Sequence, residues 1–455
     1  MPDLLCAQHV HLVGIGGSGM SALASLLLQL GKTVSGSDVQ SGAITQQLAK
    51  QGTTIRAGHA AEHVAGADYV VRSSAVADDN VEVARAKQSG LPVRKLAEAV
   101  GELMRERSGV AIAGTHGKTT TTTLVTWFLQ AGGLDPMALI GADTPVFPLG
   151  ARAGDGPLVI EADEYDRRFL EYWPEVAVVS SIEADHLDYF RDLAEIHAVF
   201  QELADRLPPR GRLIVCADDP CAATLSTAAE RATFGFGDGV DWQLGDFQAN
   251  AERGTRFTLS TDGRTWAVAS PLIGEHNARN AAAAVIVADY FGVGLRTCLA
   301  ALEAFEGPRR RFETKGRPRG VWIVDDYAHH PTEVVAVLKA ARAAADGEVW
   351  VVFQPHTTNR THALLDEFAR AFGDAQHVLV LPIYKPSGRE AAAREVSSAD
   401  LVARLNVHPD ARTVSTFEEA VEAVARRAKK GDLVLTVGAG DVTRLSDMLV
   451  ERLHR

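Results

Sequence analysis

The side chains best suited to chemistry are concentrated in residues 110–123, which read Val-Ala-Ile-Ala-Gly-Thr-His-Gly-Lys-Thr-Thr-Thr-Thr-Thr. The apolar start predicts a buried strand, Gly114 and Gly117 predict a tight turn, and Lys118 opens an apolar-periodic helix. Backbone N–H groups at such a turn face an anion, the lysine neutralises it, and the hydroxyl of Thr119 can hold Mg²⁺. The stretch therefore predicts a phosphate-binding loop.

The spacing of this loop differs from the usual pattern. About four residues normally separate its two glycines, whereas Gly114 and Gly117 enclose only two. A Gly-Lys-Thr helix start that binds no ligand is therefore an alternative that this motif alone leaves open.

A second glycine loop, Gly14 to Gly19, follows the strand-like residues 9–13 and precedes a predicted helix over 20–30. The next predicted strand, 33–38, ends at Asp38, which is 19 residues after Gly19. This arrangement is typical of a dinucleotide site. A uridine diphosphate would use the same features, with its phosphates at the helix N-terminus, and a purely structural turn also remains open.

Small and acidic residues follow other predicted strands. Residues 68–76 predict a later strand that ends in a loop of small residues. Ser73 and Ser74 in this loop could line the same ligand-binding crevice as the loop at Gly14, or could cap the next helix. Glu161 and His186 follow two short apolar runs, at the strand ends where open α/β sheets bind ligands. Magnesium prefers oxygen ligands, so Glu161 beside the Thr119 hydroxyl suits it, and His186 is a softer ligand. Helix capping is the alternative for these residues.

The last third of the chain adds further candidates. Asn277 and Asn280 are three residues apart on one predicted helix face and could address a planar base, although Asn277 could instead cap the helix. Arg311 lies in a basic run that could be a solvated linker, or could supply an arginine to a transferring phosphate. His329 and His330 have no third metal ligand spaced nearby, which favours substrate contact or helix capping.

Composition narrows the class of protein. The 455 residues predict about three domains, and the formal charge of −12 without a basic run argues against nucleic acid as a partner. The four cysteines show no paired metal spacing and fit a reducing compartment. No apolar run reaches about 18 residues and no signal pattern opens the chain, so we expect a cytoplasmic protein without membrane insertion.

Strand–loop–helix repeats predict an α/β fold with three domains. We expect an N-terminal Rossmann-like domain over 1–107, which ends at a polar linker. A central P-loop ATPase-like domain with a mixed or mainly parallel sheet would cover 108–307, with a small antiparallel insert near 240–270. A C-terminal Rossmann-like domain would cover 308–455.

With these residues assembled, the chain resembles the Mur ligases of peptidoglycan synthesis, over nearly its whole length and in the family's order of motifs. The short phosphate loop is the form that this family uses, and the motifs are most similar to those of its alanine-adding branch. The residues that carry the resemblance are Gly14–Met20, Gly114–Thr120, Glu161–Glu164, Asp185–His186, His276–Asn280, Arg311–Glu313, Asp325–Pro331, Phe353–His356 and Gly438–Asp441.

The resemblance implies roles for individual residues. UDP-N-acetylmuramate would be bound by Gly14, Ile15, Gly16, Gly17, Ser18, Gly19, Met20, Asp38, Ser73 and Ser74. ATP would be bound by Gly114, Thr115, His116, Gly117, Lys118, Thr119, Thr120, Asn277, Asn280, Arg311 and Asp326. Mg²⁺ would be held by Thr119, Glu161 and His186, the catalytic residues would be Lys118, Glu161, His186 and Arg311, and the incoming amino acid would contact Tyr327, His329, His330 and Arg360.

The implied reaction is ATP-dependent ligation of L-alanine to the carboxylate of UDP-N-acetylmuramate through an acyl phosphate, in a monomer or weak homodimer. Within the family, the alternative is a recycling ligase that attaches a preformed tripeptide. An NAD-dependent oxidoreductase would explain the loop at Gly14 but not Lys118, and a nucleotide-dependent switch protein would leave the loop at Gly14 idle. Some relatives use a carbamylated lysine, but residues 187–210 contain no lysine.

Overall fold

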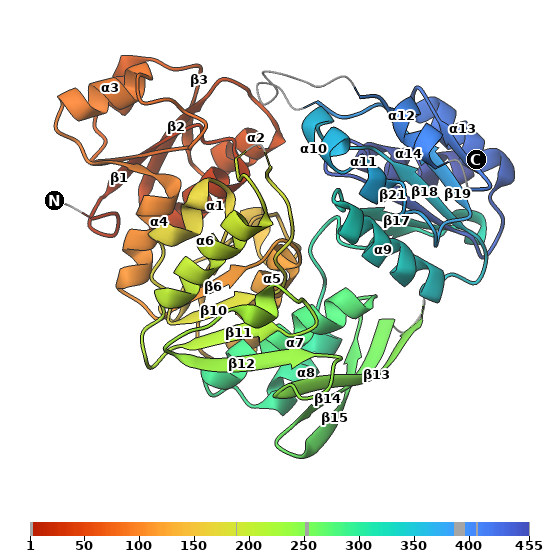
Figure 1. The fold of residues 1–455 in the computed structure, drawn as a ribbon. Coiled ribbons are helices and arrows are strands. Elements are labelled where there is room, and N and C mark those ends of the chain that lie inside the picture. The colour runs from red at the N-terminus through yellow and green to blue at the C-terminus, as the bar shows by residue number, and fades with distance from the viewer. Residues whose placement is uncertain (1–2, 188, 251–253, 386–395, 406–407, 455) are drawn as a thin grey trace. The chain divides into compact units, whose positions relative to one another are not determined.

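The computed structural model describes residues 3–187, 189–250, 254–385, 396–405 and 408–454. They form an α/β protein with three sheets (Figure 1). The chain divides into two compact units. The first unit comprises Met1–Glu183, Leu193–Gln243 and Asn280–Glu306, and the second comprises Ala184–Asp192, Leu244–Arg279 and Gly307–Arg455.

The N-terminal sheet of the first unit has the strand order β3-β2-β1-β4-β5, and all its pairs are parallel. The order reverses beside β1, and ligands bind at such switch points in open α/β sheets. The strands are β1 (His9–Val13), β2 (Thr33–Asp38), β3 (Thr54–Ala57), β4 (Tyr69–Arg72) and β5 (Val93–Lys95). The helices are α1 (Ser18–Gln29), α2 (Ala43–Lys50), η1 (Ala61–Val64), α3 (Val81–Gln88) and α4 (Leu96–Arg105).

The second sheet of the first unit is built around β6 (Gly109–Ala113), which leads directly into α5 (Lys118–Ala131). β6 lies between β10 and β9, both parallel to it, so the turn after β6 opens where the neighbouring strands also end. The other strands are β7 (Met137–Leu139), β8 (Ala151–Arg152), β9 (Leu158–Glu161), β10 (Val176–Val179), β11 (Arg212–Cys216) and β12 (Glu230–Gly235). The helices are η2 (Pro148–Gly150), η3 (Tyr165–Glu171), α6 (Leu193–Asp205), η4 (Ala222–Thr224) and α8 (Leu295–Glu303).

The predicted antiparallel insert is only partly antiparallel. β14 (Gly254–Thr261) and β15 (Arg264–Ser270) form an antiparallel hairpin. β13 (Trp242–Asn250), by contrast, starts parallel to β12. The polar–apolar alternation shows that these strands are half-buried, but it carries no information on strand direction.

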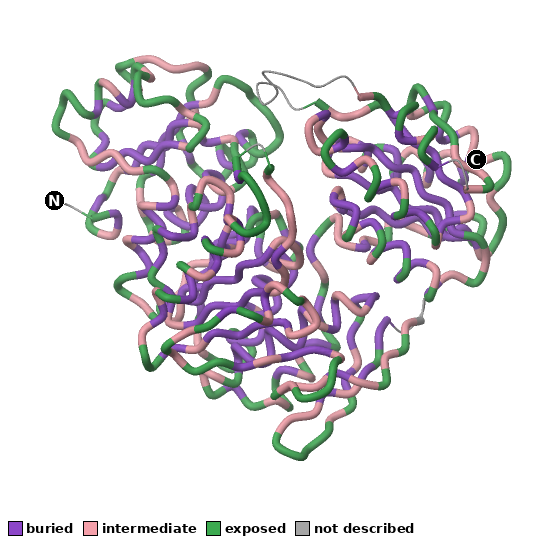
Figure 2. Tube along the Cα trace, in the orientation of Figure 1, coloured by how far each residue is buried: buried purple, intermediate pink, exposed green. Residues whose placement is uncertain are grey.

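The third sheet lies in the second unit, in the order β16-β17-β21-β18-β19-β20, with β16 antiparallel to β17 and the other pairs parallel. Two groups of buried apolar side chains cover its two faces, and the four inner strands β17, β21, β18 and β19 are buried (Figure 2). The strands are β16 (Glu313–Gly316), β17 (Trp322–Asp326), β18 (Val349–Phe353), β19 (His377–Val380), β20 (Ala411–Thr413) and β21 (Leu433–Val437). The helices are η5 (Pro318–Gly320), α9 (Pro331–Ala344), α10 (Thr358–Ala363), α11 (Leu365–Phe368), α12 (Ser398–Arg404), α13 (Phe417–Arg427) and α14 (Thr443–His454).

The predicted element positions agree closely with the structure. The predicted strands 9–13 and 33–38 are β1 and β2. The linker before the phosphate loop is short, because α4 ends at Arg105 and β6 begins at Gly109. Among the described residues, no helix is both long and apolar enough to span a membrane. The proposed domain boundaries at 107 and 307 stay predictions.

Gly101 in the middle of α4 offers a test of packing within the first unit. A Cβ at this position would collide with the backbone carbonyl oxygen of Glu171 in η3. An alanine in a helix normally stabilises it by about 1 kcal/mol relative to glycine. We expect Gly101→Ala instead to lower the free energy of unfolding by roughly 1–3 kcal/mol, because backbone must move.

Urea denaturation followed by circular dichroism measures this effect. Gly373→Ala is the matched control, since nothing lies within 4 Å of its Cβ position. The control should leave stability unchanged or slightly raised. Equal behaviour of the two variants would contradict the close approach of α4 to η3.

Candidate active site

The turn between β6 and α5 has the backbone that a phosphate-binding loop requires. Gly114 and Gly117 have φ angles of 125° and 80°, in the left-handed region that favours glycine. A Cβ at Gly117 would collide with the side chain of Asn280. The loop is anchored to the segment after β10, because Thr115 N donates to Ser181 O at 2.9 Å and Glu183 N donates to the Thr115 hydroxyl at 2.9 Å.

Lys118 is the first residue of α5, and oxygen atoms surround its partly buried ammonium group. It donates to Glu164 Oε2 at 2.8 Å and to Gly114 O at 2.6 Å. Burial by itself would lower the pKa of Lys118, but the carboxylates of Glu164 and Asp163 outweigh burial and raise it. Lys118 is therefore a fixed cation at the mouth of the loop.

Thr119 and Glu161 form a second pair of oxygen donors beside this cation. The Thr119 hydroxyl donates to Glu161 Oε1 at 3.1 Å, and Glu161 Oε2 accepts from Gly141 N at 2.8 Å. Carboxylate and hydroxyl oxygens are the ligands that Mg²⁺ prefers. These residues fit a magnesium ion next to a nucleotide phosphate, and the predicted magnesium site stays a prediction.

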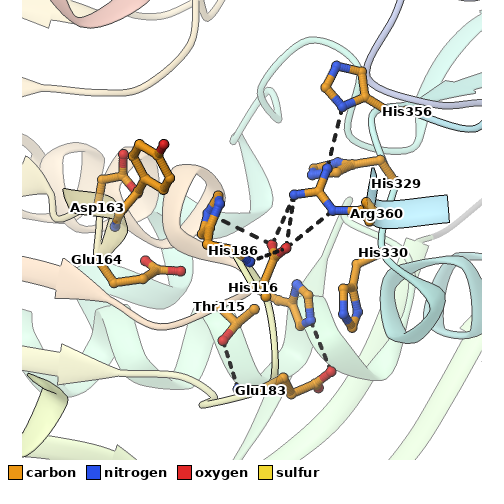
Figure 3. Close-up of polar contacts among 12 residues, drawn as sticks. Thr115, His116, Asp163, Glu164, Glu183, His186, His329, His330, His356 and Arg360 are labelled. Carbon is orange, nitrogen blue, oxygen red and sulfur yellow. Dashed lines mark hydrogen bonds and ion pairs between the residues drawn. The ribbon is translucent and has the colours of Figure 1, made fainter. Parts of the chain in front are cut away.

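The threonine run after Lys118 is accommodated by local bonding. Thr122, Thr123 and Thr126 each donate a hydroxyl to the carbonyl four residues earlier, at 2.7–2.8 Å. Their burial therefore leaves these hydroxyls satisfied. His116 lies 3.4 Å from Glu183, as the dashed line in Figure 3 marks, so this loop imidazole faces a carboxylate of the same unit.

The first glycine loop is tied to the end of β2. Gly14 N and Ile15 N both donate to Ser37 O, at 2.8 and 3.0 Å, and Gly16 N donates to Asp38 Oδ2 at 2.8 Å. The predicted role of Asp38 beside a nucleoside stays a prediction; here its carboxylate holds the loop. α1 begins at Ser18 with Gly17 as its N-cap.

The other residues predicted to bind the sugar nucleotide differ in whether their side chains are accessible. The side chains of Ile15 and Met20 are buried in the core, so a ligand could reach them only through the backbone. Ser73 packs against Gly14, where a Cβ would lie 3.0 Å from the Ser73 Cβ. Ser74 accepts from Arg168 Nη2 at 2.7 Å, and Arg168 also donates to Asp163 at 3.1 Å.

Asn277 and Asn280 lie in α7 (Glu275–Tyr290), with Asn277 inside the first turn. The helix begins before Asn277, so N-capping by this residue is wrong; its Nδ2 instead donates to Ile273 O at 2.8 Å. Asn280 accepts from the Thr121 hydroxyl at 3.2 Å and therefore packs against α5. Contact with adenine stays a prediction for both.

Aromatic and charged side chains gather at the strand ends of the second unit. We call them the ring group, which consists of Tyr327, His329, His356, Arg360 and Asp185. Tyr327 packs edge-on against His329 at 5.3 Å, and His329 packs edge-on against His356 at 5.8 Å between centroids. Arg360 in α10 donates to Asp185 through Nη2 at 3.0 and 3.2 Å and through Nε at 3.2 Å (Figure 3). The predicted amino-acid residues Tyr327, His329 and Arg360 are thus neighbours.

The protonation state of His329 follows from its surroundings. Burial lowers its pKa to about 4, so the ring is neutral near pH 7. Its Nδ1 lies 3.0 Å from Tyr327 O, a pure acceptor, which places the proton on Nδ1 and leaves Nε2 as an acceptor. His330 is the N-cap of α9 and its Nδ1 accepts from Thr332 N at 3.4 Å, which agrees with the capping alternative.

His186 follows Asp185 in the chain and has an unusual backbone. Its φ is 54°, which is uncommon for a residue other than glycine and occurs often at functional sites. Its backbone N donates to Asp185 Oδ1 at 2.8 Å. Burial raises the pKa of Asp185, but the Arg360 guanidinium, the His186 side chain and the His186 backbone N–H together outweigh burial and hold the pKa well below its usual value.

Arg311 lies just before β16, and Asp326 is the last residue of β17. Arg311 lies over the Tyr327 ring at 5.2 Å and 3.9 Å from Glu333. Asp326 accepts from Phe312 N at 2.7 Å and Ala328 N at 2.8 Å, and burial raises its pKa to about 6. Asp326 therefore fixes two loops, and its predicted contact with nucleotide stays untested.

Three residues with contacts in the site received no individual role in the sequence analysis. Glu164 holds Lys118, Asp185 holds Arg360, and His356 completes the ring group. Each stands inside a motif that the sequence did single out. The missing signal is the pairing itself, since Lys118 and Glu164 are 46 residues apart and Asp185 and Arg360 are 175 apart.

Comparison with protein-family models matches three consecutive parts of the chain. Residues 9–108 match the Mur ligase family catalytic domain, 112–288 match the Mur ligase middle domain, and 310–440 match the Mur ligase glutamate ligase domain. The three-domain α/β architecture follows from these matches and the three sheets.

Similar proteins cover almost the full length. A UDP-N-acetylmuramate–L-alanine ligase of Acidobacterium capsulatum is 42% identical over 98% of each chain, and one of Thermobifida fusca is 43% identical over 98% of this chain and 96% of that one. Among solved structures, the UDP-N-acetylmuramate–alanine ligase of Thermotoga maritima matches with a TM-score of 0.81 at 27% identity over 98% of both chains. A murein peptide ligase of Psychrobacter arcticus matches with a TM-score of 0.68 at 28% identity, over 98% of this chain and 99% of that one.

The pair between Asp185 and Arg360 predicts a pH-dependent stability. A carboxyl whose pKa falls on folding stabilises the folded state above its unfolded value, 3.8 for Asp185, and loses that contribution as pH falls further. We expect Arg360→Met to lower stability at pH 7 by about 3 kcal/mol, because Asp185 is left buried without its partner. Urea denaturation at pH 7 and pH 3 measures the difference.

The difference between Arg360→Met and wild type should shrink at pH 3. Arg404→Met is the control, because its ion pair with Asp366 is exposed, and exposed pairs contribute only about 0–1 kcal/mol. An Arg360→Met effect of the same size at both pH values would show that lost packing, and not the ion pair, is responsible.

Proposed function

The chain belongs to the Mur ligase family, and we propose that it joins L-alanine to the carboxylate of UDP-N-acetylmuramate with hydrolysis of ATP to ADP and phosphate. The proposal rests chiefly on similarity to L-alanine ligases over 98% of the chain. The partly buried Lys118 at a phosphate-type loop supports the ATP-dependent part. We place this reaction in the cytoplasm, as a step of peptidoglycan precursor synthesis.

In the proposed reaction, a carboxylate oxygen of the sugar nucleotide attacks the γ-phosphorus of ATP, and ADP leaves. The amine nitrogen of L-alanine then attacks the acyl carbon, the bond to the phosphate oxygen breaks, and inorganic phosphate leaves. Two anions must meet in the first step, so catalysis depends on positioning and charge neutralisation. Lys118 supplies a fixed positive charge at the loop, and Arg311 is the proposed second cation.

Lys118 must exchange partners when a nucleotide binds. Its ammonium is held by Glu164 at 2.8 Å, and a phosphate oxygen would take part of that coordination. Because the carboxylates keep Lys118 protonated, the cation is present before the nucleotide arrives. Glu164 thus orients the lysine toward the loop.

Thr119 and Glu161 are the proposed first-unit ligands of Mg²⁺, and His186 is a further proposed ligand. When bound, Mg²⁺ would neutralise phosphate charge and polarise the transferred group. The Glu161 carboxylate is oriented for this by Gly141 N and by the Thr119 hydroxyl.

The ring group of the second unit is the proposed amino-acid site. Arg360 would bind the carboxylate of L-alanine, for which a planar guanidinium is well suited. A neutral His329 with an accepting Nε2 can take a hydrogen bond or a proton from the amino group, which must be uncharged to attack. Asp185 holds Arg360 in the orientation seen, and the substrate carboxylate would compete with it.

The first experiment measures phosphate release from ATP and Mg²⁺ with UDP-N-acetylmuramate, in parallel with L-alanine, glycine, L-serine and a cell-wall tripeptide. We expect release to require the sugar nucleotide and to be greatest with L-alanine. Greatest release with the tripeptide would identify a recycling ligase. A murein peptide ligase is among the matched structures. Release without sugar nucleotide, or binding of NAD, would contradict the proposal.

Lys118→Ala tests the partition between the two nucleotide sites. We expect ADP formation to fall by about a thousandfold or more, the usual effect of losing a key charge-stabilising group, while UDP-N-acetylmuramate still binds in calorimetry. The Glu164→Gln variant should keep measurable activity, since Lys118 remains. Loss of sugar-nucleotide binding in folded Lys118→Ala would show that the sites are assigned wrongly.

His329→Gln tests the amino-acid site. We expect the KM for L-alanine to rise about tenfold or more, the effect of one lost hydrogen bond to a charged group, with the KM for ATP unchanged. Steady-state kinetics with each substrate varied in turn separates the two constants. A defect confined to ATP would remove His329 from the amino-acid site.

A further inference from the structure

A buried carboxylate in the N-terminal sheet is surrounded by histidines and lies outside the site described above. Glu82 stands in the first turn of α3 and is fully buried. Its Oε1 accepts from His63 Nδ1 at 2.6 Å and from Ala60 N at 3.2 Å. Its Oε2 accepts from the Ser37 hydroxyl at 2.5 Å. Glu82 therefore joins β2, the turn before η1, η1 and α3.

Two more imidazoles approach the same carboxylate. His59 Nδ1 lies 3.4 Å from Glu82 Oε2 and 3.1 Å from the Ser37 hydroxyl, and His11 Nε2 lies 3.5 Å from Oε2. Since Ser37 donates to Glu82, its oxygen is left to accept from His59. Burial would raise the pKa of Glu82, but the nearby His11 imidazole and the hydrogen bonds from Ser37 and His63 outweigh burial and lower it to about 2. Glu82 is a carboxylate at every physiological pH.

A buried carboxylate is costly unless its oxygens are fully bonded, and apolar packing of the same size would serve stability as well. What distinguishes Glu82 is the place it holds. Ser37 and His59 flank the point where β2 ends, because Ser37 precedes Asp38, and Gly58, next to His59, donates its N–H to Asp38 O at 2.8 Å.

The end of β2 in turn holds the first glycine loop. Ser37 O accepts from Gly14 N and Ile15 N, and Asp38 Oδ2 accepts from Gly16 N. A Cβ at Gly16 would lie 2.9 Å from that carboxylate oxygen, so the loop and Asp38 are in close contact. A continuous chain of hydrogen bonds thus runs from Glu82 through Ser37 to the loop that is proposed to carry the sugar-nucleotide pyrophosphate.

We propose that Glu82 is a positioning residue for sugar-nucleotide binding, which acts by holding Ser37 and His59 and through them the placement of Asp38 and the loop at Gly14–Gly19. This inference rests on the proposed function. It assigns Glu82 no contact with substrate. Its effect should therefore appear in the affinity for UDP-N-acetylmuramate and not in the ATP or amino-acid steps.

The test is Glu82→Gln, which keeps the size of the side chain but presents an amide N–H₂ where one oxygen accepted hydrogen bonds. We expect the KM and the calorimetric Kd for UDP-N-acetylmuramate to rise about tenfold, the effect of one misplaced charge-assisted hydrogen bond. The KM values for ATP and L-alanine and kcat at saturating sugar nucleotide should stay near those of the wild type. Ser37→Ala, which removes the hydroxyl between Glu82 and His59 but leaves the bonds of Glu82 to His63 and Ala60, should give a smaller rise in the same constant and serves if Glu82→Gln does not fold.

Glu102→Gln is the matched control. Glu102 in α4 accepts from the Tyr69 hydroxyl and Arg94 Nε, both at 2.7 Å, and so contacts β4 and β5 of the same sheet, away from the end of β2. It should lower stability without changing the KM for sugar nucleotide. The inference is overturned if Glu82→Gln lowers stability but leaves that KM unchanged, or if Glu102→Gln raises it equally. A wild-type chain that fails to bind UDP-N-acetylmuramate would instead overturn the proposed function, and the inference with it.

Discussion

The ion pair between Lys118 and Glu164 is the constraint around which the first unit's site is arranged. An ammonium group withdrawn from water is tolerated only when oxygen atoms surround it, and here they come from the loop itself and from Glu164, which follows β9. The left-handed glycines at 114 and 117 let the loop wrap closely enough to provide them. The parallel register of β6 and β9 places both strand ends at the same edge. The loop conformation, the strand order and the acidic side chain therefore all serve to surround the Lys118 ammonium group with oxygen atoms.

Carboxylates that accept backbone N–H groups recur at the other loops. Asp38 holds Gly16, Glu161 holds Gly141, and Asp326 holds Phe312 and Ala328. Strand ends leave backbone donors without partners, and a short acidic side chain in the same place satisfies them at a fixed geometry. The acidic character of the chain is consistent with this use. Proposed binding of anionic substrates then depends on a few fixed cations.

Two of those cations are held by carboxylates in this structure. Lys118 is paired with Glu164, and Arg360 is paired with Asp185 in a forked geometry. Such pairs keep a charged side chain oriented, and an arriving phosphate or carboxylate must compete for it. The net affinity for substrate is then the difference between the new contact with the cation and the carboxylate contact that it replaces. This small difference favours release of product as well as binding of substrate.

The sequence by itself determined the α/β class, the strands β1, β2 and β6, and both glycine loops, because alternation of apolar strands and glycine turns is a local property. It also determined the motifs on which family membership rests. Only the tertiary structure decided that β13 starts parallel to β12, that α7 begins before Asn277, and that Glu82 gathers Ser37, His59 and His63. Strand direction and pairing across tens of residues depend on how the chain packs, and no local pattern encodes them.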